Sequence, residues 1–438
     1  MIQQITFVVV LLTALYFIRR RVLEIRANIA LGKKNDYLGD RGKRFRNMVL
    51  VAFGQKKMFK RPIPAILHLF IYVGFLVINL EVLEFVIDGL AGSHRIFAPY
   101  VGGAYNVLMN LFEFLAVAVL LACVIMLIRR NILKLKRFWS EEMKGWPRLD
   151  ANLILITEIA LMCAILVMNA SDQVLQSRTT EYPSTGRLLF SSTLSSSFGL
   201  LEVSTLIIIE RLAWWFHIIG ILGFAVYITY SKHLHIALAF PNTYFTNPHT
   251  DIKGKINNMP AVTREVKMML GIAGETNQSA GEPGRFGAKD IQDLSRNSLL
   301  AAYSCTECGR CTSECPANLT GKKLSPRKIM MDTRDRMEDV RATLRKGGPG
   351  LNDGKTLLGD YITREEINAC TSCNACVEAC PIMINPLEII IEMRRYVAME
   401  ESGSPASWNS MFQNIETNFA PWKFSTADRF NWANDINK

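Results

Sequence analysis

The sequence predicts an all-α protein in which five transmembrane helices precede a soluble helical domain rich in cysteine. Half of the 438 residues are apolar, and the long apolar runs all lie before about residue 240. Eight of the ten cysteines fall between residues 305 and 380, in two groups that share one spacing. The residues between these groups have the periodicity of helices and not of strands. These observations indicate a protein of two parts.

Five apolar runs are long enough to cross a bilayer, for which a helix needs about 20 residues. The first run has no basic residue before it and three arginines directly after it. We therefore expect a retained anchor and not a cleaved signal peptide. The five runs cover roughly residues 2–18, 63–88, 105–128, 151–170 and 204–230.

The basic residues predict how these helices are oriented. A net charge of +11 would be compatible with nucleic-acid binding, but the basic residues gather at the ends of the apolar runs. Segments 19–61 and 129–148 carry many Lys and Arg, whereas segments 89–104 and 171–203 carry one and two. By the positive-inside rule, the N-terminus lies outside and the cysteine-rich domain lies in the cytoplasm. We expect a multi-pass protein of the cell (inner) membrane, with no nucleic acid as partner.

The two cysteine groups have the spacing of iron–sulfur ligands. Three thiolates at this spacing can bind one four-iron cubane, and the fourth normally binds the neighbouring cluster. Disulfides are an alternative, but they are rare in a reducing compartment. Zinc is another, but it needs two separated pairs of ligands. The groups read Cys305-x2-Cys308-x2-Cys311-x3-Cys315-Pro316 and Cys370-x2-Cys373-x2-Cys376-x3-Cys380-Pro381.

This pattern predicts two [4Fe–4S] clusters with exchanged fourth ligands. One set of ligands is Cys305, Cys308, Cys311 and Cys380, and the other is Cys370, Cys373, Cys376 and Cys315.

An internal repeat surrounds these cysteines. Each group is followed by a helix start, at Ser325-Pro326 and at Asn385-Pro386. Ser or Asn at the N-cap with Pro at the first helical position is a strong start signal. We expect a transmembrane domain over 1–245, a linker over 246–289, a helical cluster domain over 290–400 and a partner-docking tail over 401–438.

Histidines in the membrane part are candidate haem ligands. If the fifth helix continues to residue 235, His217 and His235 share one face about 27 Å apart, while His233 points elsewhere. Helices two and five are antiparallel, so His68 and His235 lie at similar depth, as bis-imidazole ligation requires. Interfacial histidines without a cofactor are the alternative. The deep His217 needs a partner or a cofactor.

Carboxylates in the apolar runs are candidates for a quinone site, because buried ionisable groups in a membrane are costly. An ion pair at headgroup level is the alternative for the last two of the set. The candidates are Glu81, Glu84, Glu113, Glu210 and Arg211.

Residues 1–245 resemble the cytochrome b, or gamma, subunit of respiratory nitrate reductase. The resemblance rests on five helices, on His68, and on His217 with the Ser231-x3-His235 pattern. It implies a five-helix cytochrome b module with haem b between His68 and His235, and quinone as substrate. That family uses four histidines, and Ile78 stands at the missing position, so a second haem would lack a ligand.

Residues 290–438 resemble the iron–sulfur part of heterodisulfide-reductase-like oxidoreductases. The motif from Ala302 to Cys311 and the second cysteine group carry this resemblance. In that family two CCG domains follow, and no CysCysGly occurs here. The resemblance therefore implies a separate CCG-domain catalytic subunit. Related membrane enzymes exchange electrons between quinone and a donor such as electron-transfer flavoprotein.

These expectations combine into an electron-transfer subunit of an oxidoreductase complex. Electrons would move between quinone and haem b in the membrane and a cytoplasmic partner, through two [4Fe–4S] clusters. The alternative is a membrane anchor or assembly subunit whose clusters only dock a catalytic partner. A transporter is a third hypothesis, but the five helices show no two-half repeat.

Overall fold

The computed structural model describes residues 1–34, 40–246, 259–272, 285–348 and 352–436. It confirms the all-α fold, because the described residues form helices and turns without a β-strand. Part of the expected linker lies outside the described residues, and α10 (Pro260–Met269) lies within it.

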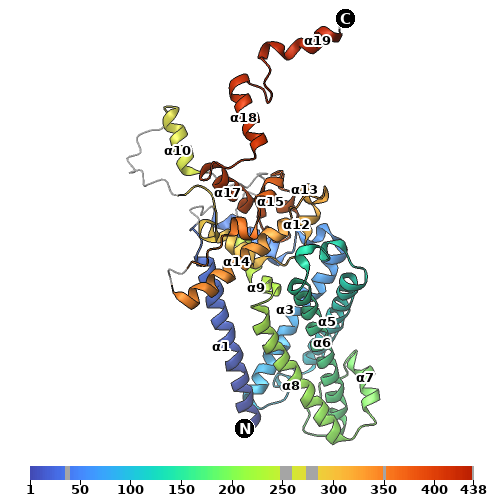
Figure 1. Cartoon of the computed structure of the whole chain (residues 1–438). Coiled ribbons are helices and arrows are strands. Elements are labelled where there is room, and N and C mark those ends of the chain that lie inside the picture. Colours follow the sequence, from blue (N-terminus) through green and yellow to red (C-terminus); the bar gives the residue numbers. More distant parts are fainter. Residues whose placement is uncertain (35–39, 247–258, 273–284, 349–351, 437–438) are drawn as a thin grey trace.

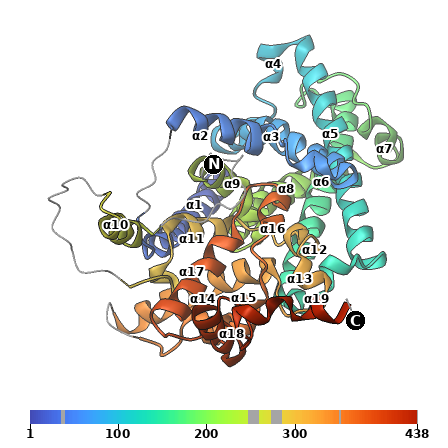
Figure 2. The ribbon, with the colours of Figure 1, turned by 90° about the horizontal axis from the view of Figure 1, so that it is seen from above.

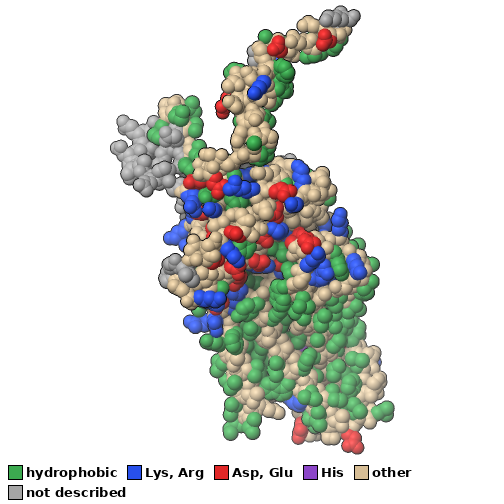
Figure 3. All heavy atoms as spheres, viewed as in Figure 1, with side chains coloured by type: hydrophobic (Ala, Val, Ile, Leu, Met, Phe, Trp, Pro, Cys, Tyr) green, Lys and Arg blue, Asp and Glu red, His purple; other side chains and the backbone are tan. Residues whose placement is uncertain are grey.

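Five helices are long and apolar enough to cross a membrane, as the sequence predicts. Each begins close to the start of its apolar run, and α1 and α6 continue well past its end. Their exposed apolar side chains cover the lower part of the molecule in Figure 3, whereas charged side chains gather above them. The five are α1 (Ile2–Ala30), α3 (Pro62–Ala91), α5 (Gly103–Leu127), α6 (Trp146–Arg178) and α8 (Val203–Ile228).

These five long helices pack around one apolar core. The helix α6 packs against α5 and α8, and α3 packs between α5 and α1. At the crossing of α1 and α3, the ring of Phe7 fits against Gly89, where an added Cβ would lie 2.7 Å from ring atoms. The core includes Phe7, Ile78, Phe85, Leu115, Val119, Met162, Ile165, Trp214 and Ile218.

Short elements connect these five helices or follow the last of them. They are α2 (Arg41–Met48), η1 (Val49–Phe53), η2 (Met58–Lys60), α4 (Ala98–Val101), η3 (Ile128–Ile132), η4 (Lys136–Phe138), η5 (Glu141–Met143), α7 (Ser191–Phe198), η6 (Lys232–Leu234) and α9 (His235–Phe245).

The cysteine-rich domain (285–400) lies at one end of the transmembrane helices, here called the cysteine side (Figure 1). The opposite end, where α1 begins, is called the far side. Both predicted helix starts are confirmed, since Ser325 accepts a hydrogen bond from Lys328 N and Asn385 accepts one from Glu388 N. The domain contains η7 (Ile291–Asp293), α11 (Arg296–Ser304), α12 (Arg310–Ser313), α13 (Pro316–Leu319), α14 (Pro326–Gly347), η8 (Leu357–Tyr361), α15 (Arg364–Ala369), α16 (Ala375–Ala379) and α17 (Pro386–Met399).

The cysteine-rich domain is joined firmly to α1. Ile25 of α1 belongs to the core of this domain, together with residues such as Leu299 and Met393. The backbone of Lys33 donates to Leu294 O at 2.8 Å and accepts from Arg296 N at 3.0 Å. Seen from above, the cysteine-rich helices lie over the end of α1 (Figure 2). The two parts of the chain therefore share one packed interface.

The C-terminal tail extends away from the rest of the molecule (Figure 1). It contains α18 (Ala406–Asn418), η9 (Thr426–Phe430) and α19 (Asn431–Ile436). Ala420 is the one buried residue among those described after Ser402, and large apolar side chains such as Phe419 and Phe430 are exposed.

The end of the fifth helix differs from the expectation. The helix α8 ends at Ile228 instead of continuing to His235, and η6 and α9 follow. The cause is Asp150 of α6, whose carboxylate accepts from Lys232 N at 3.1 Å and from Ser231 Oγ at 2.7 Å. These hydrogen bonds hold residues 231 and 232 outside the helix, so His217 and His235 do not share one helical face.

Candidate functional site

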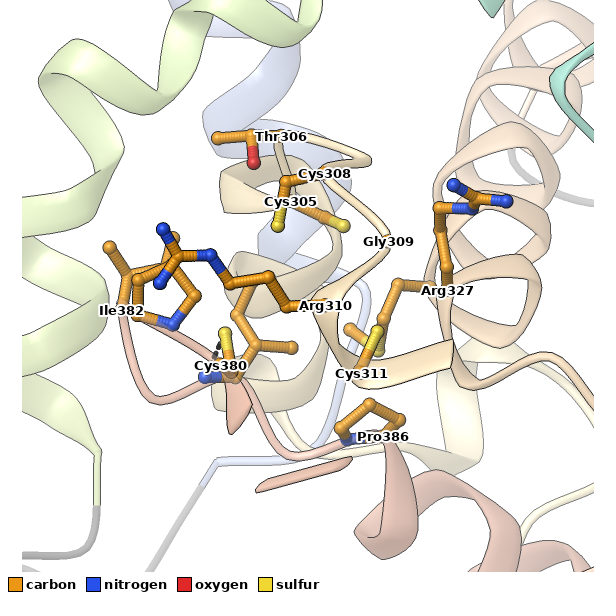
Figure 4. A pocket seen from close by; sticks show the side chains of 13 residues that line it. Cys305, Thr306, Cys308, Gly309, Arg310, Cys311, Arg327, Cys380, Ile382 and Pro386 are labelled. Carbon is orange, nitrogen blue, oxygen red and sulfur yellow. Dashed lines mark hydrogen bonds between the residues drawn. The ribbon is translucent and has the colours of Figure 1, made fainter. Parts of the chain in front are cut away.

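Four thiols from both cysteine groups line one cavity. Cys305 ends α11, Cys308 follows in a turn, and Cys311 lies on α12. Cys380, from the second group, ends α16 and lies in the same cavity. Figure 4 shows these four side chains around one space, with Arg310 and Arg327 beside them. All ten cysteines of the chain are free thiols.

The remaining four thiols form a second set. Cys315, the last cysteine of the first group, lies near Cys370, Cys373 and Cys376, close enough for these groups to influence one another's ionisation. The packing of α12 against α16 brings the two sets together.

The two cysteine loops have the same backbone conformation. Glu307 and Ser372, each two residues after the first cysteine of its group, both have φ of 54°. Gly309 and Asn374, two residues later, have φ of 72° and 62°. Left-handed residues at matching positions turn the backbone N–H groups toward the sulfur, and Ser372 N donates to Cys370 Sγ at 3.4 Å. The internal repeat is therefore a repeat of the ligand loop itself.

Burial disfavours free thiolates in these loops. It raises the pKa of Cys305 to about 12 and the pKa of Cys380 to about 11. The bare thiols of Cys305 and Cys380 are therefore protonated at neutral pH, and their thiolate forms need a cationic partner such as iron. Four thiols around one cavity fit the donor set of a [4Fe–4S] cluster.

A second cavity, of about 300 Å³, lies at the cysteine-side end of α3, α5 and α6, and His68, His233 and His235 all line it. The ring centroids of His68 and His235 are 6.3 Å apart. Contrary to the expectation, His233 does not point elsewhere, since its ring lies 5.4 Å from that of His235. The break after α8 places both histidines in this cavity.

The imidazole of His235 has a ring nitrogen that could bind a metal. Its Nδ1 lies 3.3 Å from Lys232 O, so Nδ1–H donates and Nε2 keeps its lone pair. Burial lowers its pKa to about 4, which keeps the ring neutral at pH 7. Two imidazoles that share one metal through bonds of about 2 Å would have ring centroids about 6 Å apart. The pair His68 and His235 fits this requirement.

The histidine cavity and the first cysteine cavity share a wall. Five residues line both of them: Thr306, Cys308, Arg310, Pro381 and Ile382. A buried ion pair between Lys232 and Glu307 further joins the histidine segment to the first cysteine loop. The histidine cavity and the first cysteine cavity are therefore adjacent.

Comparison with known proteins identifies the cysteine-rich domain. Residues 304–384 match the family model of the 4Fe–4S dicluster domain. The cysteine-rich domain is a 4Fe–4S dicluster domain. No solved structure matches the chain.

Related proteins are iron–sulfur oxidoreductases. The chain is 28% identical to the "Probable iron-sulfur-binding oxidoreductase FadF" of Bacillus subtilis, over 98% of this chain and 60% of that protein. It is 26% identical to the "EtfAB:quinone oxidoreductase" of Syntrophomonas wolfei, over 88% of this chain and 53% of that protein. The chain thus spans 53–60% of the length of these two relatives.

A third relative matches the dicluster part of the expectation. The chain is 25% identical to one component of the dihydromethanophenazine:CoB–CoM heterodisulfide reductase of Methanosarcina mazei, over 33% of this chain and 35% of that protein. The chain is therefore homologous to heterodisulfide-reductase-like and iron–sulfur oxidoreductases, as its dicluster motifs predict.

The five quinone-site candidates lie away from the dicluster domain and differ in their partners. Glu84 accepts from Tyr105 Oη at 2.7 Å and from Phe97 N at 3.0 Å. Glu113 accepts from Phe190 N at 2.9 Å and also from Ser191. These two carboxylates hold the far-side segments at Phe97 and Phe190 against the helices, so they have structural roles.

Glu210 and Arg211 form an ion pair at 2.9 Å, and Arg211 Nη2 lies 3.4 Å from His94 Nδ1. Glu81 is different, since it is buried and both its carboxylate oxygens lack a hydrogen-bond partner among the described residues. Glu210 leaves one carboxylate oxygen, Oε1, without such a partner, so Glu81 is the candidate with both oxygens open to a ligand.

His217 also has an open ring nitrogen. Its Nδ1 lies 3.0 Å from Leu161 O, whereas its buried Nε2 has no partner in the part of the chain that the structure describes. The ring of Phe85 lies 5.7 Å away, and Ile78 belongs to the apolar core. The described surroundings of His217 supply no second imidazole.

The sequence analysis missed several residues of the site. Glu158 of α6 lines the histidine cavity, and its signal was a lone carboxylate within the fourth apolar run. Arg130 and Arg137 line the same cavity, and they were counted only as basic loop residues. Arg95 reaches Asp172 at 2.6 Å and Asn169 at 2.7 Å, contacts that no local pattern indicates.

Proposed function

We propose that this chain is a membrane-bound electron-transfer subunit. Electrons would move between a haem b in the histidine cavity and a soluble partner, through the two clusters of the dicluster domain. The observation that carries this proposal is the shared wall, because Cys308 and Arg310 face both the histidine cavity and the first cysteine cavity. Haem and clusters, when bound, each accept and release one electron at a time.

The haem proposal rests on the fit of the residues. His68 and His235 provide two imidazoles at a suitable spacing. Arg130 lines the same cavity, and its Nε and Nη2 atoms are buried without a hydrogen-bond partner within the described ranges. A guanidinium with open donors complements the carboxylates of a haem. This arrangement also supports the resemblance of residues 1–245 to the nitrate reductase gamma subunit.

The order of the clusters follows from the two thiol sets. Cys305, Cys308, Cys311 and Cys380 would hold the cluster next to the histidine cavity. Cys315, Cys370, Cys373 and Cys376 would hold the second cluster, farther from the membrane. The side chain of Cys373 is exposed, which favours the second cluster as the point of exchange with a partner.

The exposed apolar side chains of the tail support its proposed role in docking that partner. We propose a soluble CCG-domain subunit or an electron-transfer flavoprotein in this role. The reference to EtfAB in the name of one relative favours the flavoprotein. The same name supports quinone as the membrane substrate, and Glu81 is the carboxylate best placed to contact it.

Anaerobic spectra of the purified chain test the haem proposal. We expect a b-type absorption band after reduction with dithionite, and its loss in His68→Ala and in His235→Ala. The variant His217→Ala is the matched control, because it also removes a buried imidazole but leaves the pair intact. All three variants should keep their cluster iron.

The alternative function, an anchor or assembly subunit, gives a different result. It predicts no b-type band in the wild-type chain and no reduction of any centre by added quinol. A band that persists in His68→Ala would also contradict the proposed ligand pair.

A further inference from the structure

A basic cavity of about 500 Å³ opens beside α3 on the cysteine side. It lies where η2 meets α3 and where η3 and η4 follow α5. Five cations line it, and no acidic residue does: Lys60, Arg61, Arg129, Lys136 and Arg137. Arg129 faces this cavity, whereas the next residue, Arg130, faces the histidine cavity. The basic cavity therefore adjoins the histidine cavity, with which it shares Pro64 and Arg137, but its other cations line only the basic cavity.

Most of this positive charge is not compensated by the protein. Arg61 pairs with Glu314 at 2.6 Å, and Lys60 pairs with Glu378. Among the residues that the structure describes, Arg129, Lys136 and Arg137 form no ion pair. Burial and then neighbouring positive charges, chiefly Arg61, lower the pKa of Arg137 to about 10, although Cys308 opposes this. An anion in the cavity would relieve the repulsion between these cations.

The cavity lies at the boundary between polar and apolar surface. The membrane-spanning part of α3 begins at Pro62, and the span that includes α5 and η3 ends at Ile132. Beside the cations, Ile63 is 65% exposed, Ile132 is 71% exposed and Leu133 is 61% exposed. Aliphatic side chains this exposed next to a group of cations suit a molecule with an anionic head and apolar tails.

We propose that this cavity binds the phosphate headgroup of an anionic phospholipid from the leaflet on the cysteine side. The guanidinium groups of Arg129 and Arg137 would bind the phosphate oxygens, and the acyl chains would lie along Ile63 and Ile132. Basic pockets between transmembrane helices are known to bind such headgroups, and arginine suits phosphate because of its planar donors. This inference does not depend on the proposed electron transfer.

Lipid binding to the full chain in detergent tests the proposal, with native mass spectrometry as the measurement. Dioleoylphosphatidylglycerol is the probe, dioleoylphosphatidylcholine is the neutral comparison and inorganic phosphate is the competitor. We expect one tightly bound phosphatidylglycerol on the wild-type chain. The double variant Arg129→Gln/Lys136→Gln should bind it about thirtyfold more weakly, given the usual contribution of each cation near an anionic lipid surface. Lys136→Gln alone changes an exposed side chain and should show a smaller loss in a folded protein.

The matched control is Lys43→Gln/Arg46→Gln on α2, which removes the same charges from exposed positions outside the cavity. It should bind phosphatidylglycerol like the wild type. Equal binding by the Arg129→Gln/Lys136→Gln variant, or equal binding of phosphatidylcholine by the wild type, would overturn the proposal. Complete displacement of the lipid by millimolar inorganic phosphate would also overturn it, because the ligand would then be free phosphate.

Discussion

Cys380 belongs to the second cysteine group by sequence, but it lies with the first three cysteines of the first group in space. Cys315 makes the opposite exchange. A single side chain in each group therefore ties the two ligand loops together. Loss of Cys380 therefore removes a ligand from the first spatial set, and loss of Cys315 removes a ligand from the second.

This exchange predicts different products for two serine variants. Cys380→Ser should lose the cluster next to the histidine cavity, and Cys315→Ser should lose the second cluster. Each purified variant should contain about four irons per chain instead of about eight. Two measurements would distinguish the variants. In Cys380→Ser, electron paramagnetic resonance should still detect a reducible second cluster. The b-type band of the same variant should no longer be reduced by electrons from the dicluster domain. An iron loss that follows sequence group and not spatial set would contradict the assignment.

At the scale of elements, the start of α14 packs against the loop between α5 and α6. Arg327 lies in the first turn of α14, and its side chain is fully buried. Its guanidinium donates to Arg137 O at 2.5 Å and to Glu142 Oε1 at 2.7 Å. Ser325, the N-cap of α14, also donates to Glu142 at 2.6 Å. The carboxylate of Glu142 thus compensates a buried charge at the contact between the membrane part and the dicluster domain.

Glu142→Gln should therefore destabilise this contact by about 3 kcal/mol, because it leaves the buried Arg327 without its counter-ion. Glu141→Gln is the matched control, since the neighbouring Glu141 is 83% exposed and pairs only with Lys144. Thermal unfolding of the dicluster domain, followed by cluster absorption, measures the difference. Equal midpoints for the two variants would show that the ion pair does not hold the contact.

The same carboxylate sets the pH range of this contact. Burial acts to raise the pKa of Glu142, but Arg327 and Ser325 outweigh it, so the pKa lies below the ordinary value of 4.5. A carboxyl whose pKa is lowered by folding stabilises the folded state at pH values above its pKa in the unfolded chain. This stability is lost as the pH falls through its pKa in the folded chain. We expect the Glu142 contribution to be constant from about pH 5 to 8 and to disappear only in stronger acid. Thermal midpoints of the wild-type chain and of Glu142→Gln, measured across this range and below it, check the expectation.

At the scale of the whole molecule, the far side and the cysteine side carry different surfaces. The described parts of the basic segments, residues 19–34, 40–61 and 129–148, lie toward the dicluster domain, and α7 lies on the far side (Figure 1). If the positive-inside rule holds for this chain, the dicluster domain faces the cytoplasm.

Labelling of intact cells tests this topology. Ser196→Cys on α7 should react with a membrane-impermeant maleimide, because Ser196 is exposed on the far side. Lys346→Cys at the end of α14 should react only after the cells are opened. The wild-type chain gives the background from its native cysteines. The reverse pattern of labelling would show that the dicluster domain lies outside.

Much of this fold could be predicted because its signals are local. The apolar runs, the Ser325-Pro326 and Asn385-Pro386 helix starts and the cysteine spacing each depend on residues close in sequence. The end of α8 could not be predicted, because Asp150 acts from 82 residues away on Lys232. The position of His233 in the histidine cavity follows from that same contact. Glu158 could have been found, since the rule that selected Glu81 applies to it equally.

The joint between α1 and the dicluster domain has a consequence for biogenesis. Lys33 leaves the ribosome long before its partners Leu294 and Arg296, and the core around Ile25 also needs Met393. The N-terminal helix therefore completes its packing only after the chain has been translated as far as Met393.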